Sequence, residues 1–385
     1  MSGKVAFNLQ PLASGNLTGI GYYTQNVMSE IIKSGRFSSA EFQAFDFLGR
    51  NNAADTLTER LFFKGSENIR IVKSMPLGAY IRAGKAGKMF PYEKLLKSEA
   101  DLTVFFNYLS PQGLTGKNII TIYDMVVGRY PDTMDDRNRK LLERHLQKSA
   151  DNAEHIVTIS EFSRNEIAEQ LSIPKEKISV AYCGVDTGFY CPANDVSDKE
   201  IVRKYTDDKY ILYVGTLEPR KNIPVLLDAF RIVSSKNPSL KLILAGKLGW
   251  HSEGVSNAIE TSPVKDRIIL TGYISDTEKR ALYRNAEAFV FPSLYEGFGM
   301  PPIEAMACGT GCVCADTSSL PEVTKGNALL FSSDDYEEAA SLILKMIEMK
   351  SDNSLEIDSF IKTASEYKWK KTSDVFMNVI DSCLK

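Results

Sequence analysis

Short apolar runs recur along the first half of the chain, and polar stretches long enough for a helix separate them. The runs lack the strict alternation expected of a strand with one solvated face. Strands that helices cover on both faces of a parallel sheet give this pattern. We therefore expect strands at residues 4–9, 42–48, 69–72, 102–106, 119–123 and 156–159.

The same pattern returns in the second half, where strands are expected at residues 210–215, 242–246, 268–272, 288–292 and 311–315. Between the halves, a segment with Gly188, Pro192 and a polar run marks the best domain boundary. A chain of 385 residues also favours two domains. The predicted fold class is α/β, with two doubly wound Rossmann-like domains. Their bounds are 1–186 and 209–366, with a linker at 187–208 and a C-terminal segment at 367–385.

Composition narrows the class of protein. The chain is 43% hydrophobic and 25% charged, as in ordinary soluble globular proteins. Its net charge of -3 argues against nucleic acid as a bulk partner. The N-terminus lacks the apolar stretch of a signal peptide, and no run of about 18 apolar residues predicts a membrane span. We therefore expect a cytoplasmic protein.

The chain has six cysteines, which we expect to be reduced in that compartment. Cys308, Cys312 and Cys314 cluster, which raises the question of a metal site. None of the histidines lies near them in sequence, and they fall at a helix end and in a buried strand. Packing as small hydrophobic residues is the favoured role, and no metal site is predicted.

A glycine-containing segment follows the first expected strand. Gly15, Gly19 and Gly21 precede a helix predicted from Tyr22 to Ser34, and this order opens nucleotide-binding α/β units. The spacing differs from G-x-G-x-x-G, and no acidic residue stands at the distance expected for ribose binding. A nicotinamide cofactor is therefore disfavoured, and a plain glycine turn before an amphipathic helix stays an alternative.

The most informative stretch is residues 293–316, which follows the apolar run at 288–292. A helix is expected from Pro301 to Cys308, with Gly309 as its stop, because proline suits the first helical turn and glycine the C-terminal cap. The helix start offers unpaired backbone N–H groups and the positive end of the helix dipole, and both suit phosphate.

Two carboxylates accompany that helix start. Glu296 lies in the preceding turn with Gly297 and Gly299, and Glu304 lies in the first helical turn. Glycines let a ligand approach the backbone closely, and carboxylates accept hydrogen bonds from hydroxyls. Phosphate and hydroxyl recognition together predict a sugar nucleotide. The alternative is a strand–loop–helix corner in which Glu304 merely offsets the helix dipole.

Two adjacent cations follow the strand that ends at Gly215. Arg220 can grip two oxygens, and Lys221 adds a point charge, so the pair suits a diphosphate. Taken alone, the pair is better explained as surface charge, and its position beside Glu296 and Glu304 favours the diphosphate. On the other half of the chain, Asp124 stands just past the strand at 119–123, where ligands bind in open α/β sheets. A helix or turn cap is the alternative role for this aspartate.

Several of these motifs resemble retaining glycosyltransferases of family 4. The sequence E-G-F-G-M-P-P-I-E resembles the family's signature, T-G-I-G-Y-Y its first glycine loop, and G-T-L-E-P-R-K-N its G-x-x-x-x-x-K-N segment. The likeness runs along nearly the whole chain. It implies the GT-B fold, in which two doubly wound domains face a central cleft. The acceptor would bind on the N-terminal side and the donor mostly on the C-terminal domain, and residues 367–385 would cross back as a helix.

The resemblance also implies a role for each matching residue. In the catalytic set, Glu296 would bind the sugar hydroxyls, Arg220 and Lys221 would neutralise the leaving nucleoside diphosphate, and Asp124 would orient the acceptor or sugar. Glu304 would bind the ribose hydroxyls. The other implied donor contacts, many of them through the backbone, are Gly19, Gly21, Gly215, Tyr273, Ile274, Gly297, Phe298, Gly299, Met300 and Pro301.

One position departs from the family pattern. The family carries a histidine before the strand-end aspartate, and Tyr123 stands there in this chain. In the family that position touches the transferred sugar. Tyrosine can form hydrogen bonds, but it does not titrate near neutral pH. We therefore count Tyr123 among the donor contacts. The departure implies either a different sugar preference or a chain that binds donor without turnover.

The resemblance implies a retaining hexosyltransferase that needs no cofactor or metal beyond its nucleotide-sugar substrate. The wording of the motifs is most similar to mannosyltransferases that use GDP-mannose, and a UDP-linked sugar is the alternative. The implied acceptor is a saccharide or lipid-linked saccharide in surface polysaccharide synthesis. A non-catalytic subunit that binds sugar nucleotide stays open as a second class, and a GT-B epimerase or phosphorylase as a third.

Residues 79–98 mix basic and aromatic side chains. Such a segment can lie on an anionic membrane surface, which would hold the protein at the inner face of the cell membrane. The alternative, slightly favoured by the pattern, is a solvated helix face with core anchors.

Overall fold

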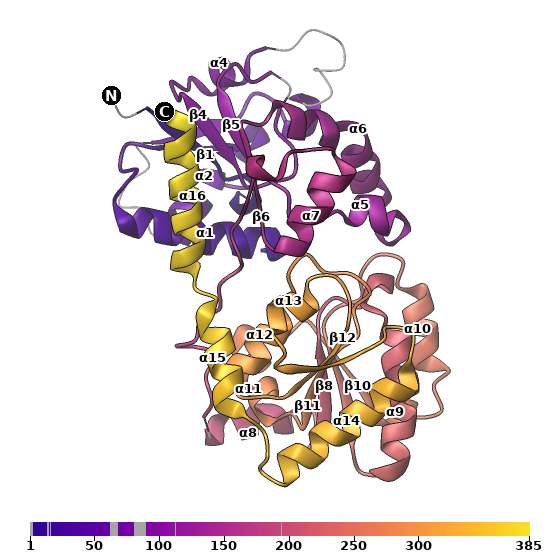
Figure 1. Ribbon diagram of the computed structural model, residues 1–385. Helices are drawn as coiled ribbons and strands as arrows, with labels where there is room; N and C mark the ends of the chain where they lie inside the picture. The colour runs from indigo at the N-terminus through magenta and orange to yellow at the C-terminus, as the bar shows by residue number, and fades with distance from the viewer. Residues whose placement is uncertain are drawn as a thin grey trace.

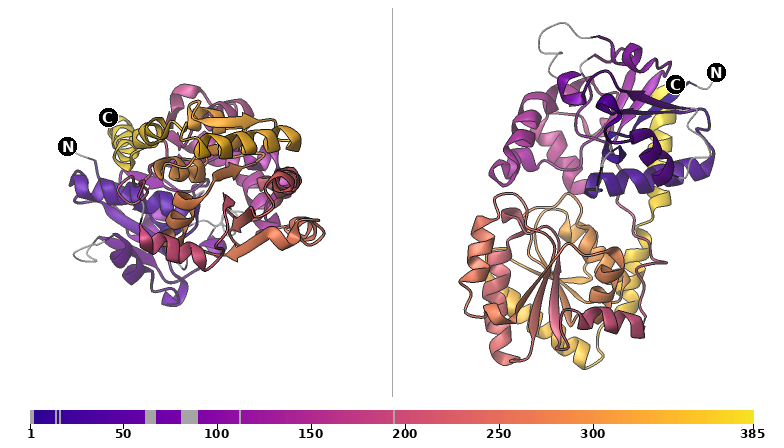
Figure 2. Two further views of the ribbon diagram at one scale, coloured as in Figure 1. Left: turned by 90° about the horizontal axis from the view of Figure 1, so that it is seen from below. Right: turned by 180° about the vertical axis from the view of Figure 1, so that it is seen from behind.

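The computed structural model describes residues 3–13, 15, 17–61, 68–80, 90–111, 113–193 and 195–385. These residues form two domains stacked on one another, and the C-terminal helix returns to the first (Figure 1). Two further views show helices on both faces of each sheet (Figure 2). All strand pairs are parallel, which confirms the predicted doubly wound α/β class.

The first domain contains, within the described residues, a seven-stranded sheet in the order β3-β2-β1-β4-β5-β6-β7. Each apolar run expected in this half coincides with a strand. The strand β7 was missed because it is a short edge strand with a serine at its centre. The strands are β1 (Val5–Asn8), β2 (Glu41–Phe45), β3 (Ile69–Val72), β4 (Leu102–Phe105), β5 (Lys117–Thr121), β6 (His155–Thr158) and β7 (Ile178–Val180).

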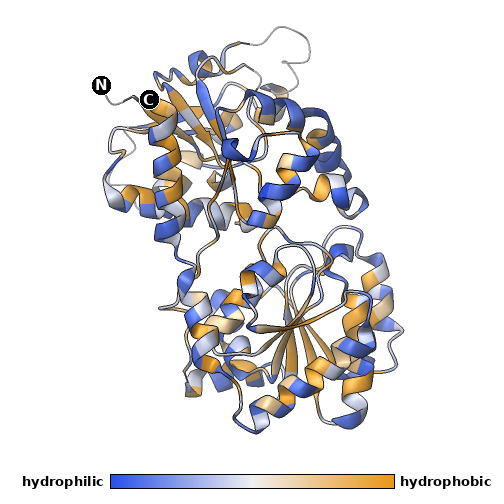
Figure 3. Ribbon diagram, in the orientation of Figure 1, coloured by the Kyte–Doolittle hydropathy of each residue, from blue (hydrophilic) through white to orange (hydrophobic). Residues whose placement is uncertain are grey.

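The second domain contains a six-stranded sheet in the order β10-β9-β8-β11-β12-β13, again counted over the described residues. Its strands form the most apolar layer of the domain (Figure 3). Cys312 and Cys314 lie in β12 and are fully buried, and Cys308 ends the preceding helix with 5% exposure. The strands are β8 (Tyr210–Val214), β9 (Lys241–Ala245), β10 (Ile268–Gly272), β11 (Ala288–Phe291), β12 (Cys312–Ala315) and β13 (Ala328–Phe331).

Helices connect the strands and cover the sheets. In the first domain they are α1 (Gly19–Ser34), α2 (Ala53–Leu61), α4 (Tyr92–Leu96), α5 (Val126–Arg129), α6 (Asp136–Asn152) and α7 (Glu161–Gln170). The remaining helices are α8 (Val196–Arg203), α9 (Ile223–Lys236), α10 (Glu253–Glu260), α11 (Asp276–Asn285), α12 (Met300–Ala307), α13 (Leu320–Thr324), α14 (Tyr336–Ser351), α15 (Ile357–Glu366) and α16 (Trp369–Leu384).

Two helix starts differ from the sequence expectation. Helix α1 begins at Gly19 because the Thr18 side chain caps it, accepting a hydrogen bond from the Gly21 N–H at 3.4 Å. Gly19 and Gly21 therefore lie in the first helical turn rather than in a loop. Helix α11 is capped by Ser275, not by Asp276, because the hydroxyl of Ser275 and the carboxylate of Glu278 form a reciprocal capping box.

Part of the segment expected as a linker belongs to the second domain. Helix α8 packs against α11, and the Asp198 carboxylate pairs with the Arg284 guanidinium at 2.6 Å. Asp198 is 1% exposed, so this ion pair is buried. The connection between the domains therefore ends before α8. This charge-rich helix resembles a polar linker in the sequence, but the ion pair with Arg284 of α11 fixes it in the second domain.

The last two helices are divided between the domains. Helix α15 packs on α12 in the second domain, and α16 packs on α1 in the first. At the crossing, the Val185 N–H donates to the carbonyl of Tyr367 at 3.0 Å. The Trp369 ring then packs edge-on against Tyr22 and Tyr23 of α1. The start of α16 is thus held where the two connections between the domains meet.

We expect Gly184→Ala to lower the free energy of unfolding by about 1–3 kcal/mol, the usual cost of overpacking. A Cβ atom at position 184 would lie 2.4 Å from the backbone nitrogen of Trp369 and 2.6 Å from its ring. Denaturant unfolding measures the change. Gly254→Ala in α10 is the control, because its Cβ would meet nothing within 4 Å. Equal stabilities of the two variants would contradict this account of the crossing.

The basic and aromatic segment at 79–98 lies mostly outside the described residues, which omit 81–89. Of its described aromatic residues, Tyr80 and Tyr92 are buried in the core, and Phe90 is exposed. The expected membrane contact therefore stays untested. Among the described residues, no helix has both the length and the apolar character needed to cross a membrane.

Candidate active site

Among the described strands, the order of each sheet reverses between β1 and β4 in the first domain and between β8 and β11 in the second. Connections leave to opposite faces at such a point, and the crevice at the carboxyl ends of the strands is where open α/β sheets bind ligands. In the second domain this point brings together predicted residues from distant segments. Arg220 and Lys221 lie in the short helical turn η5 (Pro219–Lys221) after β8, and Glu296 follows β11.

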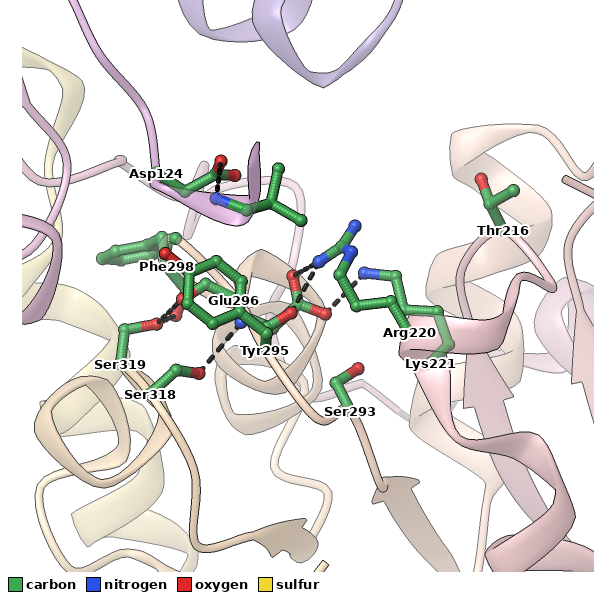
Figure 4. Close-up of polar contacts among 12 residues, drawn as sticks. Asp124, Thr216, Arg220, Lys221, Ser293, Tyr295, Glu296, Phe298, Ser318 and Ser319 are labelled. Carbon is green, nitrogen blue, oxygen red and sulfur yellow. Dashed lines mark hydrogen bonds and ion pairs between the residues drawn. The ribbon is translucent and has the colours of Figure 1, made fainter. Parts of the chain in front are cut away.

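The Glu296 carboxylate is the centre of this group (Figure 4). One of its oxygens accepts from Lys221 Nζ at 2.5 Å, and the other lies 3.4 Å from Arg220 Nη1. The same Nη1 donates to the carbonyl of Tyr295 at 2.6 Å, and Nη2 pairs with Glu218 at 2.8 Å. Glu296 and Lys221 are each 9% exposed, so two cations and two carboxylates balance each other in a largely buried position.

Burial and charge act in opposite directions on this group. Burial by itself would raise the pKa of the Glu296 carboxyl, but Lys221 and Arg220 outweigh it and hold that pKa below its usual value. Burial lowers the pKa of Lys221, and the neighbouring Arg220 lowers it further against the pull of Glu296. An additional anion beside these cations would reverse that shift. A phosphate group placed beside Lys221 would thus stabilise its charged form.

Helix α12 begins next to this group. The backbone N–H groups of Gly297, Phe298 and Gly299 have no hydrogen-bond partner among the described residues. The carbonyl of Phe298 accepts from Ser319 Oγ at 2.9 Å, which fixes the turn, and the Phe298 ring is buried. With Met300 and Pro301 forming the first helical turn, this helix start can supply N–H donors to phosphate or sugar oxygens.

Gly297 is also a point of close approach between the domains. A Cβ atom there would lie 2.6 Å from the carbonyl oxygen of Tyr123 and 3.2 Å from Cβ of Asp124. The hydroxyl of Ser163 in the first domain lies 3.3 Å from the Gly297 carbonyl. A side chain at 297 would therefore push the two domains apart, so glycine is required for this contact.

Glu304 is buried inside the second domain, with 3% exposure. Its oxygens accept from Lys279 Nζ and from the Tyr283 hydroxyl, both at 3.0 Å. Burial raises the pKa of this carboxyl, and Lys279 opposes the shift. Sequence reasoning missed both partners, because their spacing of four residues places them on one face of α11 but does not indicate Glu304 on α12 as their partner. Burial and the nearby Glu304 charge raise the pKa of Tyr22 to about 12, so the start of α1 lies near this carboxylate.

Asp124 faces the Glu296 group from the first domain (Figure 4). It follows β5, and its Oδ1 accepts from the Tyr108 hydroxyl at 3.0 Å and from the Val126 N–H at 3.2 Å. Burial raises the pKa of the Asp124 carboxyl, and the positive charge of Arg220 opposes that rise. Tyr108 was not predicted from the sequence, where it stands in a polar segment without a motif.

Tyr123 does not lie where the sequence analysis put it. Its side chain is 5% exposed, and its hydroxyl donates to the carbonyl of Phe106 at 3.3 Å. Its ring packs edge-on against Tyr23 in the core of the first domain. Consecutive residues of an extended chain point to opposite sides, so Asp124 faces the second domain while Tyr123 turns inward. The departure from the family histidine therefore affects the core, and Tyr123 is removed from the group of donor contacts.

Three of the other predicted donor contacts follow the strands β8 and β10 of the second domain. Gly215 follows β8, and its N–H donates to the carbonyl of Ala245 at 2.9 Å. Tyr273 and Ile274 follow β10, so β9 separates them from the Arg220 segment. The Tyr273 side chain is 85% exposed and Ile274 is half-buried. A nucleobase at this sheet edge would extend away from a diphosphate bound at β8.

Three acidic residues of the site form ion pairs with cations and do not form a cluster of carboxylates. Glu218 and Glu296 pair with Arg220, and Glu304 pairs with Lys279. The described part of the chain contains no group of three His, Cys, Asp or Glu side chains placed to hold a metal ion. Independence from metal stays a prediction for the binding experiment described below.

Tyr295 connects the two halves of the site. Its hydroxyl donates to the Glu166 carboxylate at 2.5 Å and accepts from the Met125 N–H at 2.8 Å, and both partners are in the first domain. A second contact lies nearby: the Glu322 carboxylate of α13 accepts from the N–H groups of Glu161 and Phe162 at the start of α7. Tyr295 precedes Glu296 and Met125 follows Asp124, so the hydrogen bond between Tyr295 and Met125 fixes the two carboxylates relative to one another.

We expect Tyr295→Phe to lower the free energy of unfolding by about 1–3 kcal/mol, since it leaves two buried polar groups without their partner. Nucleotide affinity should stay, because Arg220 contacts the backbone carbonyl of Tyr295 rather than its hydroxyl. The turnover number should fall about tenfold, because Asp124 and Glu296 would no longer be held in a fixed relative position. Denaturant unfolding and steady-state kinetics test this. Tyr130→Phe is the control, because the Tyr130 ring packs on Tyr295 at 5.7 Å; an equal loss in both variants would reject the hydrogen-bond explanation.

Two family models match the chain. The model described as Glycosyltransferase Family 4 covers residues 67–189, and the model described as Glycosyl transferases group 1 covers residues 195–363. O-antigen chain mannosyltransferase B of Escherichia coli is 30% identical over 275 residues, 71% of this chain and 72% of that protein. O-antigen chain mannosyltransferase RfbU of Salmonella typhimurium is 30% identical over 243 residues, 63% of this chain and 64% of that protein.

Solved structures share the arrangement of both domains. Sucrose-phosphate synthase from Thermosynechococcus elongatus superposes with a TM-score of 0.74 at 17% identity, over 99% of this chain and 98% of that one. HepE of Anabaena, solved in complex with UDP-glucose, gives 0.72 at 18% identity, over 99% and 100%. Structural likeness at such identities concerns the fold alone, and it confirms the expected GT-B architecture. With the family models and the 30% identical relative, the conclusion is that the chain belongs to glycosyltransferase family 4, within the group 1 glycosyltransferases.

Proposed function

We propose that this glycosyltransferase is a retaining hexosyltransferase that moves mannose from GDP-mannose to a saccharide or lipid-linked acceptor in surface polysaccharide synthesis. The observation that carries the proposal is the buried Glu296 carboxylate held by Lys221 and Arg220 beside the start of α12. Relatives described as O-antigen mannosyltransferases support the choice of sugar and pathway class.

The charges at the site suit the departure of a nucleoside diphosphate. When the bond between the sugar's anomeric carbon and the diphosphate oxygen breaks, negative charge develops on that oxygen. Arg220, Lys221 and the free N–H groups at the start of α12 stabilise this charge where it appears. The acceptor oxygen then bonds to the anomeric carbon from the same face, and its proton passes to the leaving phosphate. Glu296 holds sugar hydroxyls, which keeps the anomeric carbon in place.

Glu304 and Asp124 take the remaining positions. Glu304 is assigned to the ribose hydroxyls of the nucleotide, which requires one of its oxygens to exchange its present partner, Lys279 or Tyr283, for a hydroxyl. Asp124 approaches from the first domain and orients the acceptor hydroxyl or the sugar. The positive charge of Arg220 acts on Asp124 and offsets part of the repulsion between this carboxylate and the leaving diphosphate.

Two alternatives are kept because an observation favours each. A UDP-linked sugar as donor is favoured by the HepE complex with UDP-glucose. A non-catalytic subunit that binds sugar nucleotide is favoured by Tyr123 in place of the family histidine, since the inward turn of this side chain removes one sugar contact. The first alternative predicts turnover with another base, and the second predicts binding without turnover.

Calorimetric titration with GDP, UDP and ADP, with and without EDTA, tests the donor site. We expect micromolar binding of GDP, unchanged by EDTA and lost in the double variant Arg220→Ala/Lys221→Ala. The matched control is Arg203→Ala/Lys204→Ala, an adjacent Arg–Lys pair exposed at the end of α8. Failure of all three nucleotides to bind would overturn the proposal, and tightest binding of UDP would replace the donor.

A turnover assay then separates the enzyme from the binding subunit. The wild type is incubated with GDP-mannose and an alkyl α-mannoside, and the product is followed by proton NMR. An α-linked product from the α-linked donor supports retention. No release of GDP from GDP-mannose despite GDP binding would support the non-catalytic alternative, whereas release of GDP without a mannoside product would show hydrolysis and reject that alternative.

A further inference from the structure

A cavity of about 360 Å³ lies in the first domain, at the point where the order of its sheet reverses. Asn8 at the end of β1 and Phe105 at the end of β4 both line it. This position corresponds to that of the Glu296 group in the second domain, where the order reverses between β8 and β11. Since ligands of open α/β sheets bind at such points, the cavity is positioned as a second ligand site.

The cavity adjoins the proposed reaction centre through one side chain. Tyr108 lines the cavity, and its hydroxyl donates to Asp124 Oδ1 at 3.0 Å. A molecule that places a hydroxyl near Asp124 therefore has the cavity directly behind Tyr108. The cavity is thus on the acceptor side of the site rather than on the side of Arg220.

The lining consists of apolar side chains and uncharged polar ones. Two of the polar side chains, Asn8 and Gln10, are used in internal hydrogen bonds, and the others are Asn107, Tyr108, Ser110, Asn138 and His145. The Asn8 side chain donates to the Tyr92 hydroxyl and accepts from the Gln10 N–H. The Gln10 amide bonds both the N–H and the carbonyl of Phe45. No Asp, Glu, Lys or Arg is found among the described lining residues. The apolar side chains include Ile20, Leu77, Phe105, Leu109, Met134 and Leu142.

We propose that this cavity binds an uncharged apolar group of the acceptor, an alkyl or isoprenyl chain or an aromatic group attached close to the accepting sugar. A charged group needs a counter-ion, and a sugar ring needs hydrogen-bond partners around most of its edge, whereas the larger part of this lining is apolar. The proposal rests on the proposed function for the identity of the acceptor. It implies that the accepting sugar is near the apolar group and not at the end of a long polysaccharide.

The test is a titration with α-mannosides whose aglycone is methyl, butyl, hexyl or octyl, each below its micelle-forming concentration and without donor. We expect the affinity to rise roughly fourfold per methylene, the factor for burying one CH₂, until the cavity is filled. An acceptor could also offer apolar surface through its sugar ring instead of its aglycone chain. Methyl 6-deoxy-α-mannoside tests that possibility. A gain from removing the 6-hydroxyl, with none from a longer chain, would overturn the proposal of a chain-binding cavity.

Substitutions of lining residues test whether the dependence of affinity on chain length arises in this cavity. Met134→Gln keeps the length of the side chain but adds an amide, and should weaken octyl mannoside binding about tenfold without affecting methyl mannoside. Ser110→Phe should fill the cavity from its rim and give the same loss, which guards against a folding defect in one variant. Leu114→Asn is the control, because this half-buried leucine lies outside the lining. An equal loss in the control would reject the assignment.

GDP titration of the same samples separates this inference from the proposed function. If GDP binds and affinity does not depend on chain length, the cavity assignment fails while the transferase proposal stands. If octyl mannoside binds in a chain-length-dependent way but no nucleotide does, the cavity binds apolar chains and the transferase proposal fails.

Discussion

The Lys221→Met variant is expected to lose about 3 kcal/mol of the free energy of unfolding, together with most nucleotide-sugar activity. Lys221 is the closest partner of the buried Glu296 carboxylate, at 2.5 Å, and its ammonium lies 5.5 Å from the centre of the Phe291 ring. Methionine fills a similar volume without charge. Among the described residues, Arg220 at 3.4 Å would then be the remaining cation paired with Glu296. Removing one partner of a buried ion pair costs more than the pair contributes, because the other charge stays buried.

The activity of that variant should fall about a hundredfold or more in kcat/KM, the usual cost of losing one donor to a developing oxyanion. The double variant Lys221→Met/Glu296→Gln separates the two effects. It removes both charges of the pair, so the free energy of unfolding should recover to within about 1 kcal/mol of the wild type. Activity should not recover. Stability and activity that return together would show that Lys221 acts only through the fold.

The pH dependence of stability provides a second measurement on the same variant. The folded pKa of Glu296 is lowered, so its contribution is fully present above the ordinary carboxyl value of 4.5 and is lost as the pH falls through the folded pKa. The difference in unfolding free energy between the wild type and Lys221→Met should therefore be largest near neutral pH and shrink in acid. Urea unfolding at several pH values measures it.

The Asp124→Asn variant should lose turnover but keep its stability, unlike Lys221→Met, which should lose both. The asparagine oxygen can still accept from the Tyr108 hydroxyl and the Val126 N–H, so the local structure is retained. Burial raises the pKa of Asp124, which means that the charged carboxylate is disfavoured in the folded protein. Asparagine removes that cost, and the free energy of unfolding should stay equal or rise slightly. We expect kcat to fall about a hundredfold, as for a lost group that acts on a proton or a hydroxyl.

Nucleotide binding should be unaffected in Asp124→Asn, because the diphosphate is bound on the other domain. The wild-type rate should fall as the pH drops through the raised pKa of Asp124, above its ordinary value of 3.8, since the ionised form orients the hydroxyl. The variant should lack this limb of the pH–rate profile. Asp132→Asn, at an exposed position nearby, is the control. A variant with full activity would remove Asp124 from the mechanism.

Much of the framework could be predicted from local pattern. Apolar runs at 210–215 and 288–292 become β8 and β11, because an apolar stretch of that length between helical segments is stable only in a covered parallel sheet. Pro301 and the glycines before it predicted the start of α12, since their backbone preferences are local. The adjacent Arg220 and Lys221 were identified because a charged pair directly after a strand lies at the ligand-binding edge.

Other features depend on residues that are far apart in the chain. The Tyr295 hydroxyl bonds Met125 and Glu166, which lie 170 and 129 residues away, and no local pattern predicts that contact. Tyr123 was predicted to contact the donor from a motif, but the surrounding Tyr23 and Phe106 provide it with a buried site instead. Burial and pairing are set by the partners that the fold brings together, so they decide which way a side chain turns and whether its charge is kept.

For this protein, the sequence by itself determined the two parallel sheets, the strand ends that hold Asp124, Arg220 and Glu296, and the helix start at α12. These follow from backbone preferences and hydrophobic periodicity, which act over a few residues. Only the tertiary structure decided that Lys279 holds Glu304, that Gly297 must be small, and that an apolar cavity lies behind Tyr108. Packing between distant segments sets such contacts, and local preference contains no information about them.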